Sequence, residues 1–498
     1  MITRSDVELH ADPSRVLARL FVPGHELPTE TESRATGVLS RILTLPEPAV
    51  RAALEHVRAE YLARHRDLPG ILRANYEQIA HRIPDGSPLS PERKALLGAT
   101  FTHEYSIEGA ALFNPSMVAH PDQSKLPAGA VRFVMSLRAV GEGHISSIEF
   151  RTGSWAPGHQ LRIDDPGPHV ESGTIARTRH DRDLFAERLH EEGADAESAR
   201  YLVSRLAAEF DFAELENALQ ALHGQQVTRH GAAHTQEIAR SVVRNSYRVA
   251  FAAESRLPER VLWPYGPAES QGLEDARFVR FVEDDGAVCY LAPYTAFDGH
   301  HIAPQLITTT DFREFAVSQF AGPGAKNKGL ALFPRRVGGR YLALSRWDRE
   351  NCSIAFSADG RRWENGPQVY EPCESWELIQ TGNCGSPLET EAGWLVLTHA
   401  VGPMREYAIG ALLLDLHDPT RVLGRLPEPL LRARESERDG YVPNVVYSCG
   451  GMIHNGELLL PYGVSDAAVR FAFFDIAELL ARLTTGVSPA ATRANKSA

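Results

Sequence analysis

One short pattern, Ser/Thr-x-Asp-x-x-x-aromatic, occurs twice, as Thr309-Thr310-Asp311-Phe312-Arg313-Glu314-Phe315 and as Ser357-Ala358-Asp359-Gly360-Arg361-Arg362-Trp363. From about residue 241 onward, the chain around these copies is a succession of short strand-like runs joined by turns rich in Gly, Asp, Asn and Pro. Such a succession favours a β-sandwich, a β-barrel or a β-propeller. The Asp residues of the two copies lie 48 positions apart (311 and 359), which suits one four-stranded blade and favours the propeller.

The first hundred residues have a different character. Within residues 48–65, apolar side chains recur at helical spacing, and these are Val50, Leu54, Val57 and Tyr61. Pro91 suits the first turn of a further helix. We therefore expect an N-terminal helical region over residues 1–100.

Strand-like runs rich in Val, Ile, Phe and Ser follow, so residues 101–485 are predicted to form one mainly β domain. A helical insertion at about 181–224 interrupts it, because Leu202, Leu206 and Phe210 lie four residues apart on a predicted apolar stripe. A short helix is expected near the end of this domain, around 476–483. The last residues, 486–498, are expected to be a disordered tail.

Composition excludes several classes of protein. The 498 residues include 52 Lys plus Arg against 64 Asp plus Glu, a net charge of −12 without a basic run, so nucleic acid is not an expected partner. The five cysteines form no CxxC pair, which indicates neither a disulfide framework nor a thiolate metal site. No signal peptide and no membrane-spanning run is recognisable, and the sequence predicts a cytoplasmic protein without a membrane partner.

The sequence also gives little indication of a metal or nucleotide site. His300 and His301 are adjacent but have no carboxylate at a ligand-like interval, so we predict no metal site. Gly141-Glu142-Gly143 lacks the Gly-Lys-Ser/Thr ending of a phosphate-binding P-loop. Several aromatic residues near acids and arginines could stack on sugar rings, although core packing is the commoner role; they are Trp263, Tyr265, Tyr294, Trp347, Trp376 and Tyr441.

The most informative string is Gly272-Leu273-Glu274-Asp275-Ala276-Arg277-Phe278, just before a predicted strand. It could place a carboxylate at the inner mouth of a blade, or it could be a turn locked by an Asp/Arg pair. On an extended strand, Glu274 and Asp275 point to opposite faces, so only one of them is expected to serve as an acid.

Two cations are predicted to converge on an anion. Lys328 comes just before the apolar run Leu330-Ala331-Leu332-Phe333, and Arg346 ends the run that pairs with it, so both could lie at one end of a sheet. Lys and Arg together suit phosphate. The alternative is two solvated surface cations. His399 ends another apolar run, where a lone histidine is more often a hydrogen-bonded structural residue.

Taken together, these strings resemble glycoside hydrolase family 130, the inverting β-mannoside phosphorylases and related β-mannosidases. The strings that carry the resemblance occur in the order of the family; they are Phe113-Asn114-Pro115, Ser136-Leu137-Arg138-Ala139, Gly272-Leu273-Glu274-Asp275-Ala276-Arg277, Tyr294-Thr295-Ala296-Phe297-Asp298-Gly299, Lys328 with Leu332-Phe333-Pro334, Gly393-Trp394-Leu395 with His399, and Tyr462-Gly463-Val464-Ser465-Asp466. The resemblance spans roughly residues 113–474. It does not cover the N-terminal helical region.

The resemblance implies a five-bladed β-propeller whose site lies at the axial mouth. It implies that Asp275 is the general acid and that phosphate is the co-substrate, with no cofactor and no metal. The predicted substrate-binding residues are Asn114, Arg138, Glu274, Arg277 and Asp466, of which Arg138 and Asp466 are implied to hold the mannose. The candidates for phosphate binding are Lys328, Arg346 and His399. The expected partners are a mannose-containing oligosaccharide and phosphate.

Two departures from the family pattern bear on these expectations. Ala276 stands where Pro is usual, which relaxes the backbone but keeps the carboxylate. Ser345-Arg346 stands where many relatives have His-Arg, so one phosphate contact is missing. The leading prediction is a β-mannoside phosphorylase, and the alternatives are a β-mannosidase that uses water and a non-catalytic glycan-binding propeller. The helical additions could reshape the acceptor side or form the interface of a homo-oligomer.

Overall fold

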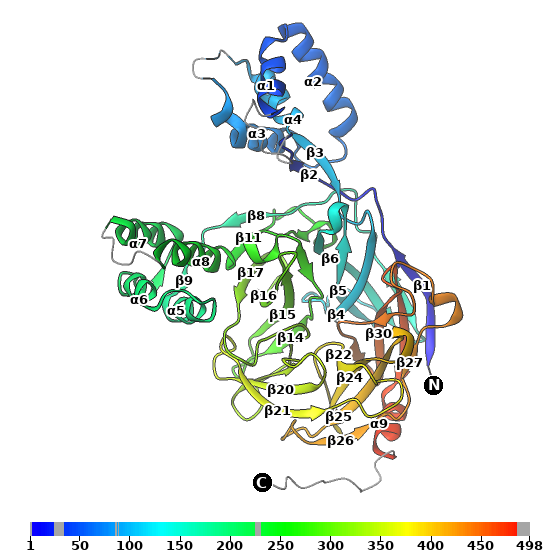
Figure 1. The fold of residues 1–498 in the computed structure, drawn as a ribbon. Coiled ribbons are helices and arrows are strands. Elements are labelled where there is room, and N and C mark those ends of the chain that lie inside the picture. Colours follow the sequence, from blue (N-terminus) through cyan, green and yellow to red (C-terminus); the bar gives the residue numbers. More distant parts are fainter. Residues whose placement is uncertain (1, 24–33, 85–86, 88, 225–230, 486–498) are drawn as a thin grey trace.

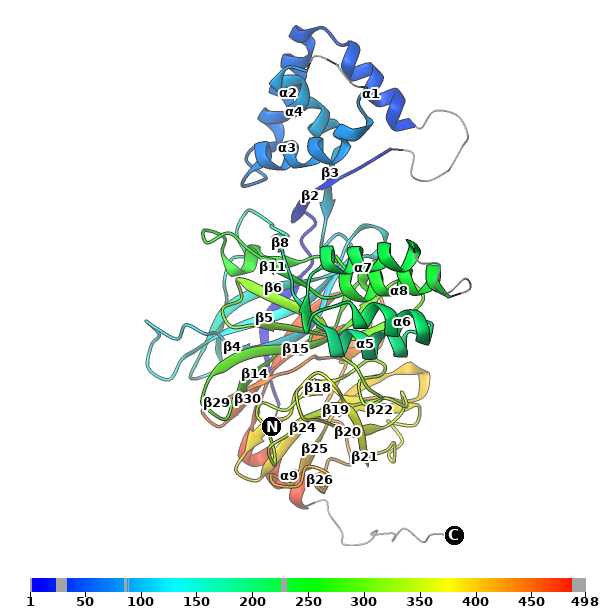
Figure 2. The same cartoon turned by 90° about the vertical axis from the view of Figure 1, so that its left-hand side faces the viewer.

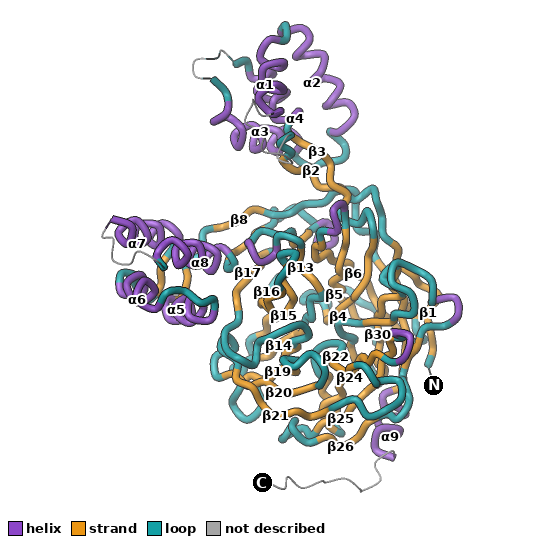
Figure 3. Tube along the Cα trace, in the orientation of Figure 1, coloured by secondary structure: helices purple, strands orange, loops and turns teal. Residues whose placement is uncertain are grey.

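The computed structural model describes residues 2–23, 34–84, 87, 89–224 and 231–485. The molecule is mainly β, with two groups of helices standing outside the strand-rich body (Figure 1). In Figure 2, turned by 90°, one group stands clear above the body and the other lies in front of it. Figure 3 shows that the body consists mostly of strands and loops. Within the described ranges, no helix is long and apolar enough to cross a membrane. The predicted tail at 486–498 lies outside the described residues.

Four sheets of four or more strands make up the body of the described chain. The largest, of 12 strands, contains β4 (Ala111–Ala119), β5 (Val131–Val140), β6 (Ser146–Ala156), β7 (Gln160–Ile163), β8 (Thr174–Ala176), β11 (Tyr247–Ala250), β12 (Val261–Leu262), β13 (Gly272–Glu274), β14 (Val279–Val282), β15 (Val288–Phe297), β16 (Ile302–Thr309) and β17 (Glu314–Gln319). Its pairings are antiparallel except between β6 and β13, which meet in parallel at one residue pair, Ser146 and Gly272.

The other three sheets follow in chain order. The four-stranded sheet contains β18 (Ala331–Leu332), β19 (Tyr341–Ser345), β20 (Cys352–Ser357) and β21 (Glu364–Tyr370). The six-stranded sheet contains β22 (Gln380–Asn383), β23 (Leu388–Thr390), β24 (Gly393–Val401), β25 (Tyr407–Leu414), β26 (Val422–Arg425) and β27 (Leu431–Arg432). The five-stranded sheet contains β1 (Thr3–His10), β28 (Val446–Tyr447), β29 (Met452–His454), β30 (Glu457–Val464) and β31 (Ala468–Asp475), followed by helix α9 (Ile476–Thr485). The helix predicted around 476–483 is thus confirmed.

The repeated pattern marks the same turn in two sheets. One copy joins β16 to β17 and the other joins β20 to β21. In the first turn the Thr309 hydroxyl accepts the N–H of Phe312 at 2.9 Å, and in the second the Ser357 hydroxyl accepts the N–H of Gly360 at 2.8 Å. The Asp of each copy accepts two further N–H groups, so the pattern is repeated because one hydrogen-bonded turn is repeated.

The prediction of a helical region over the whole of residues 1–100 was wrong for its first twenty residues. Strand β1 pairs with β31, so the two ends of the described chain share one sheet. Arg470 of β31 holds Glu8 of β1 with an ion pair of 3.1 Å. Because the partner of β1 lies more than 450 positions away, local periodicity could not reveal this pairing.

The helices of the N-terminal region stand on a two-stranded stem. The stem consists of β2 (Val16–Leu20) and β3 (Thr102–Ser106), and the helices between them are α1 (Arg34–Thr44), α2 (Glu47–Tyr61), α3 (Leu68–Ile79) and α4 (Pro91–Thr100). At the foot of the stem, Arg15 is fully buried between the carboxylates of Glu108 and Glu149, 2.7 Å from each. Arg151 on β6 contacts the same two side chains, so a buried network of two arginines and two glutamates fixes the stem to the body. Burial and the neighbouring Glu149 raise the pKa of Glu108 to about 8.

The predicted insertion is present and extends farther than 224. It contains β9 (His180–Asp181), α5 (Arg182–Glu191), α6 (Ala196–Ser204), β10 (Glu209–Phe210), α7 (Phe212–Gly224) and α8 (Ala232–Arg244). The predicted stripe of Leu202, Leu206 and Phe210 is buried in the core of this insertion. These residues do not share one helix, because α6 ends at Ser204 and the chain turns there.

Candidate active site

A cleft of about 580 Å³ opens where residues from all four large sheets meet. Seven charged side chains line it, and they are the cations Arg138, Lys328, Arg346, Arg349 and Arg405 and the carboxylates Asp275 and Asp466. Three of the cations, Arg346, Arg349 and Arg405, have no ion pair in the described part of the chain. The cleft therefore carries an excess of positive charge that its own carboxylates do not balance.

The acid predicted from the sequence lies at the end of a short strand. Strand β13 ends at Glu274, and Asp275 has a φ of +56°, in the left-handed region that Asp tolerates better than most residues. Our expectation that Glu274 and Asp275 point to opposite faces was therefore wrong, because Asp275 is no longer extended. Both carboxylates reach Arg138, at 2.7 Å from Glu274 and 3.7 Å from Asp275.

Two neighbouring strands hold Asp275 in place. Asn114 lies in an irregular part of β4, with a φ of +49°, and its side-chain amide donates to Oδ1 of Asp275 at 2.7 Å. Arg138 of β5 is fixed in turn by Ser146, whose hydroxyl accepts its Nε–H at 3.0 Å, and by the ring of Phe113 under its guanidinium. The predicted residues Asn114 and Arg138 thus contact the predicted acid directly.

The electrostatic surroundings keep Asp275 ionised in the unliganded protein. Burial disfavours its charged form, but the positive charges of Arg138, Lys328 and Arg277 and the amide of Asn114 outweigh this effect. The pKa of Asp275 consequently lies below its ordinary value. A proton donor at this position needs a further negative charge nearby before it holds its proton at neutral pH.

Asp466, the last residue of the predicted closing motif, is the second carboxyl group that lines the cleft. It follows β30 in a left-handed turn, with a φ of +50°, and lines the cleft. Burial and the nearby carboxylate of Asp275 raise the pKa of Asp466 to about 6, although Arg138 and Arg405 oppose the shift. The two carboxyl groups of the cleft therefore have different pKa values, and Asp466 binds a proton more readily than Asp275 does.

Glu274 and Arg277 were predicted to bind substrate, but the structure places both beneath the cleft. Glu274 bridges two cations, with Oε1 at 2.7 Å from Arg138 and Oε2 at 2.5 Å from Lys328. The buried guanidinium of Arg277 donates to the carbonyl of Asn383 at 2.9 Å and to the hydroxyl of Tyr447 at 2.6 Å. Their observed contacts support the residues that line the cleft.

The predicted phosphate residues do converge. Lys328 precedes β18 and Arg346 follows β19, and because these strands pair, both side chains line the same cleft. Nη1 of Arg346 lies 3.1 Å from Nε2 of His399, which lies near the end of β24. Arginine can only donate, so Nε2 accepts, and the proton of His399 resides on Nδ1, 3.2 Å from the carbonyl of Asn383.

His399 is thereby a neutral support for Arg346. Burial, together with the positive charges of Arg346 and Arg277, lowers the pKa of His399 well below its ordinary value. Both of its ring nitrogens are engaged, whereas Nε of Arg346 is buried without a partner in the described chain. Ser345, at the position where relatives have His, donates its hydroxyl to the carbonyl of Gly324 instead of lining the cleft.

Sequence reasoning missed two arginines of the cleft. Arg349 has a φ of +72°, its carbonyl accepts from Arg346 and its Nε donates to Asn327. Arg405 has a φ of +56° in a short 3-10 turn. Both stand next to a glutamate in the sequence and look like ordinary surface pairs, so no local signal could have identified them.

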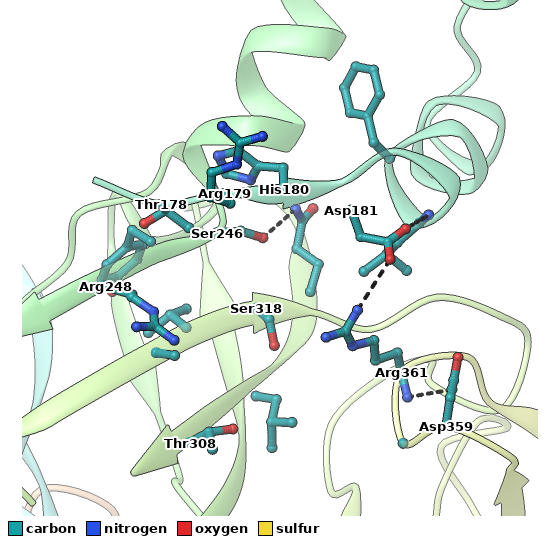
Figure 4. A pocket seen from close by; sticks show the side chains of 18 of the residues that line it. Thr178, Arg179, His180, Asp181, Ser246, Arg248, Thr308, Ser318, Asp359 and Arg361 are labelled. Carbon is teal, nitrogen blue, oxygen red and sulfur yellow. Dashed lines mark hydrogen bonds and ion pairs between the residues drawn. The ribbon is translucent and has the colours of Figure 1, made fainter. Parts of the chain in front are cut away.

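A second cavity, of about 440 Å³, lies between the helical insertion and the body (Figure 4). Two of the arginines that line it are in ion pairs: Arg361 lies 3.5 Å from Asp181, and Arg179 lies 3.6 Å from Glu214, which is outside the cavity. None of the predicted site residues lines it. In the described chain, no group of three or more His, Cys, Asp or Glu residues could hold a metal ion.

The cleft combines a carboxyl group that could transfer a proton with several cations that could bind an anion. This combination is typical of enzymes that assist bond cleavage by proton transfer and use an anionic substrate. A family model described as beta-1,4-mannooligosaccharide phosphorylase, that of glycoside hydrolase family 130, matches residues 225–485. The chain belongs to this family.

The chain is also similar to individual proteins. The chain is 32% identical over 228 residues to a 1,2-beta-oligomannan phosphorylase of Thermoanaerobacter sp., covering 45% of this chain and 75% of the relative. It is 32% identical over 232 residues to a beta-1,2-mannobiose phosphorylase of Listeria innocua, covering 45% of this chain and 63% of that relative. A solved structure of a Listeria innocua beta-1,2-mannobiose phosphorylase in complex with beta-1,2-mannobiose covers 76% of this chain and 93% of its own, at 23% identity and a TM-score of 0.45.

Proposed function

We propose that the protein is an inverting β-mannoside phosphorylase, which cleaves a terminal β-mannosyl linkage with inorganic phosphate. Membership of family 130 supports the substrate class. The single observation that carries phosphorolysis is the set of unpaired cations facing Asp275 across the cleft, with Arg346 held in place by a neutral histidine. Such a set binds a phosphate anion, and an anion needs no base to become a nucleophile.

The proposed reaction exchanges one bond for another. A phosphate oxygen attacks the anomeric carbon of the terminal mannose, and the bond from that carbon to the glycosidic oxygen breaks on the opposite face. Asp275 gives its proton to the departing oxygen, directly or through a sugar hydroxyl. The products are α-mannose 1-phosphate and a saccharide shortened by one unit.

Phosphate binding also explains how Asp275 acquires the proton that a general acid needs at neutral pH. In the empty cleft, Arg138 and Lys328 hold the carboxylate ionised. A bound phosphate places negative charge among the same cations, which weakens their effect and raises the pKa of Asp275. We therefore infer that the general acid takes up its proton when phosphate binds, so the enzyme becomes competent only with its co-substrate in place.

Roles for the other residues follow from their contacts. Arg346 and Lys328 are proposed phosphate ligands, and Asn383 and His399 are positioning residues that orient Arg346. Arg138 and Asp466 line the cleft beside Asp275 and are proposed to bind the terminal mannose. The reaction requires no cofactor other than phosphate.

The sheet order supports the proposal of a five-bladed propeller. The 12-stranded sheet is held together at its middle by one residue pair between β6 and β13, which divides it into two antiparallel groups. With the other three sheets this makes five groups, and β1 joins the last of them. Pairing of the first strand with the last group is a simple way to close a ring of blades.

Hydrolysis is the second candidate, because one observation favours it. An inverting hydrolase needs a carboxylate that takes a proton from water, and Asp466 is a second carboxylate in the lining of the cleft. Turnover of β-1,2- and β-1,4-mannobiose with and without phosphate separates the two. Phosphorolysis predicts no free mannose without phosphate, whereas an unchanged rate of mannose release would establish the hydrolase. Binding of both sugars without any turnover would leave a glycan-binding protein.

A further inference from the structure

A third cavity, of about 590 Å³, lies where the N-terminal stem meets the body. We name it the stem groove and define it by Arg19 of β2, His103 and Tyr105 of β3, Glu142, and Trp263 and Tyr265. Its walls are largely aromatic, since the rings of Tyr105 and Trp263 meet edge to face at 4.8 Å. A groove of aromatic faces with a few polar groups is the kind of surface that binds sugar rings.

The aromatic groups of the stem groove differ in exposure, since Tyr105 is buried, Trp263 is half-buried and Tyr265 is 54% exposed. The backbone N–H of Tyr265 donates to the buried Glu269 at 3.0 Å. The hydroxyl of Tyr105 donates to the carbonyl of Glu142 at 2.6 Å. A side chain at Gly141 would collide with the Tyr105 ring, so this wall is tightly packed. A rigid exposed ring offers contact area at little cost in conformational entropy.

Arg19 adds a cation to the wall of the stem groove. Its guanidinium lies over the Trp263 ring at 4.2 Å, and burial lowers its pKa. Among the described residues it has no hydrogen bond or ion pair from its side chain, and it borders both the stem groove and a smaller adjoining cavity of about 150 Å³. A half-buried donor without a partner is suited to the hydroxyl groups of a ligand.

The stem groove lies next to the active-site cleft, because chain neighbours of their lining residues contact each other. Val442 lines the cleft, and its neighbour Tyr441 contacts His144, with ring centroids 6.1 Å apart. The residues on either side of His144 line the stem groove. Ser270 of the groove and Asp275 of the cleft are five residues apart, so their Cα atoms are at most about 18 Å apart. The Tyr441–His144 contact is therefore the rim between the two.

We propose that the stem groove binds the distal mannosyl units of a β-mannooligosaccharide whose terminal unit occupies the cleft. This inference rests on the proposed function, because it assigns the rest of the substrate to a place on the same molecule. The saccharide passes from Asp275 over the Tyr441–His144 rim to Tyr265 and Trp263. The protein thereby favours chains longer than a disaccharide, and its N-terminal stem, which the family match does not include, provides part of the binding surface.

The test compares chain lengths in two variants of the stem groove. We expect Tyr265→Ala and Trp263→Ala each to lower kcat/KM for a β-mannopentaose about tenfold and to leave that for the matching mannobiose unchanged, the loss expected for one stacking contact. Tyr61→Ala is the matched control, because this tyrosine is 40% exposed on α2 and lies outside the groove. Equal effects on both lengths, or no effect of either groove variant, would overturn the proposal.

A second readout does not depend on turnover. Calorimetric titration of β-1,2- and β-1,4-mannopentaose into the wild type without phosphate should show binding that Tyr265→Ala weakens about tenfold and Tyr61→Ala leaves intact. Failure to cleave any mannoside would contradict the proposed function, whereas equal pentaose affinity in the wild type and Tyr265→Ala would contradict the stem groove. Because Tyr265 is largely exposed, its substitution is not expected to disturb folding.

Discussion

Gly382 on β22 decides whether Arg346 and His399 can face the cleft together. A Cβ atom at this position would lie 2.3 Å from Cδ and 2.6 Å from Nε of Arg346, and 2.8 Å from Cε1 of His399. Real Cβ atoms do not approach other atoms so closely, so Gly382→Ala must displace the arginine, the histidine or both. The 3.1 Å hydrogen bond between them would be lost or lengthened.

Gly382→Ala is expected to weaken the binding of phosphate. Loss of one charge-assisted contact is worth about 1.5–3 kcal/mol, which corresponds to an increase of about 10- to 100-fold in the KM for phosphate. Overpacking adds a destabilisation of about 1–3 kcal/mol. Steady-state kinetics with phosphate as the varied substrate, together with urea unfolding, separate the two effects.

The matched control is Gly37→Ala on α1. Here the nearest atom to an added Cβ is 3.7 Å away, in a flexible side chain, so nothing has to move. Gly37→Ala should keep the wild-type KM for phosphate. If Gly382→Ala folds normally and also keeps the wild-type KM, then Arg346 does not bind phosphate in the orientation described here.

Four further predictions follow from the site and from its supports. Asp275→Asn should lower kcat by about 10²- to 10⁴-fold with sugar affinity retained, measured by initial rates and calorimetry, and unchanged activity would reject it as the acid. Phosphate binding at pH 7 should take up protons, seen as a calorimetric enthalpy that varies with the ionisation enthalpy of the buffer, and an invariant enthalpy would contradict the coupling to Asp275. Because the pKa of Asp466 is raised to about 6, its protonated form stabilises the folded protein; this stabilisation is complete below the unfolded pKa near 4 and is lost as the pH rises through 6. Between pH 4 and 7, the unfolding free energy of Asp466→Asn, measured with urea, should therefore rise by about 2 kcal/mol relative to that of the wild type. Parallel pH profiles of the two proteins would refute this. Arg15→Met should cost about 3–5 kcal/mol of unfolding free energy, because it leaves Glu108 and Glu149 buried beside one arginine, and a loss below about 1 kcal/mol would show that the buried network does not fix the stem.

Much of the cleft could be predicted because its residues stand in recognisable local strings. Asn114, Arg138, Asp275 and Asp466 each lie in a string that resembles a family motif, and the structure brings all four to one cleft. The repeated turn could also be recognised in the sequence, because the same Ser/Thr and Asp hydrogen bonds require the same residue types in both copies.

Other features depend on backbone geometry or on distant partners. Glu274 and Asp275 share Arg138 only because Asp275 leaves the extended conformation, which residue identity does not determine. The role of His399 depends on which of its nitrogens faces Arg346. The pairing of β1 with β31 depends on a partner at the other end of the chain.

The most direct test of the central claim follows the phosphorus atom of the co-substrate. ³¹P NMR of the wild type incubated with a β-mannobiose and inorganic phosphate reports the product and the configuration at its anomeric carbon together. The account predicts a growing signal of α-mannose 1-phosphate that Asp275→Asn abolishes. An unchanged phosphate signal while free mannose accumulates, or a β-configured sugar phosphate, would contradict it.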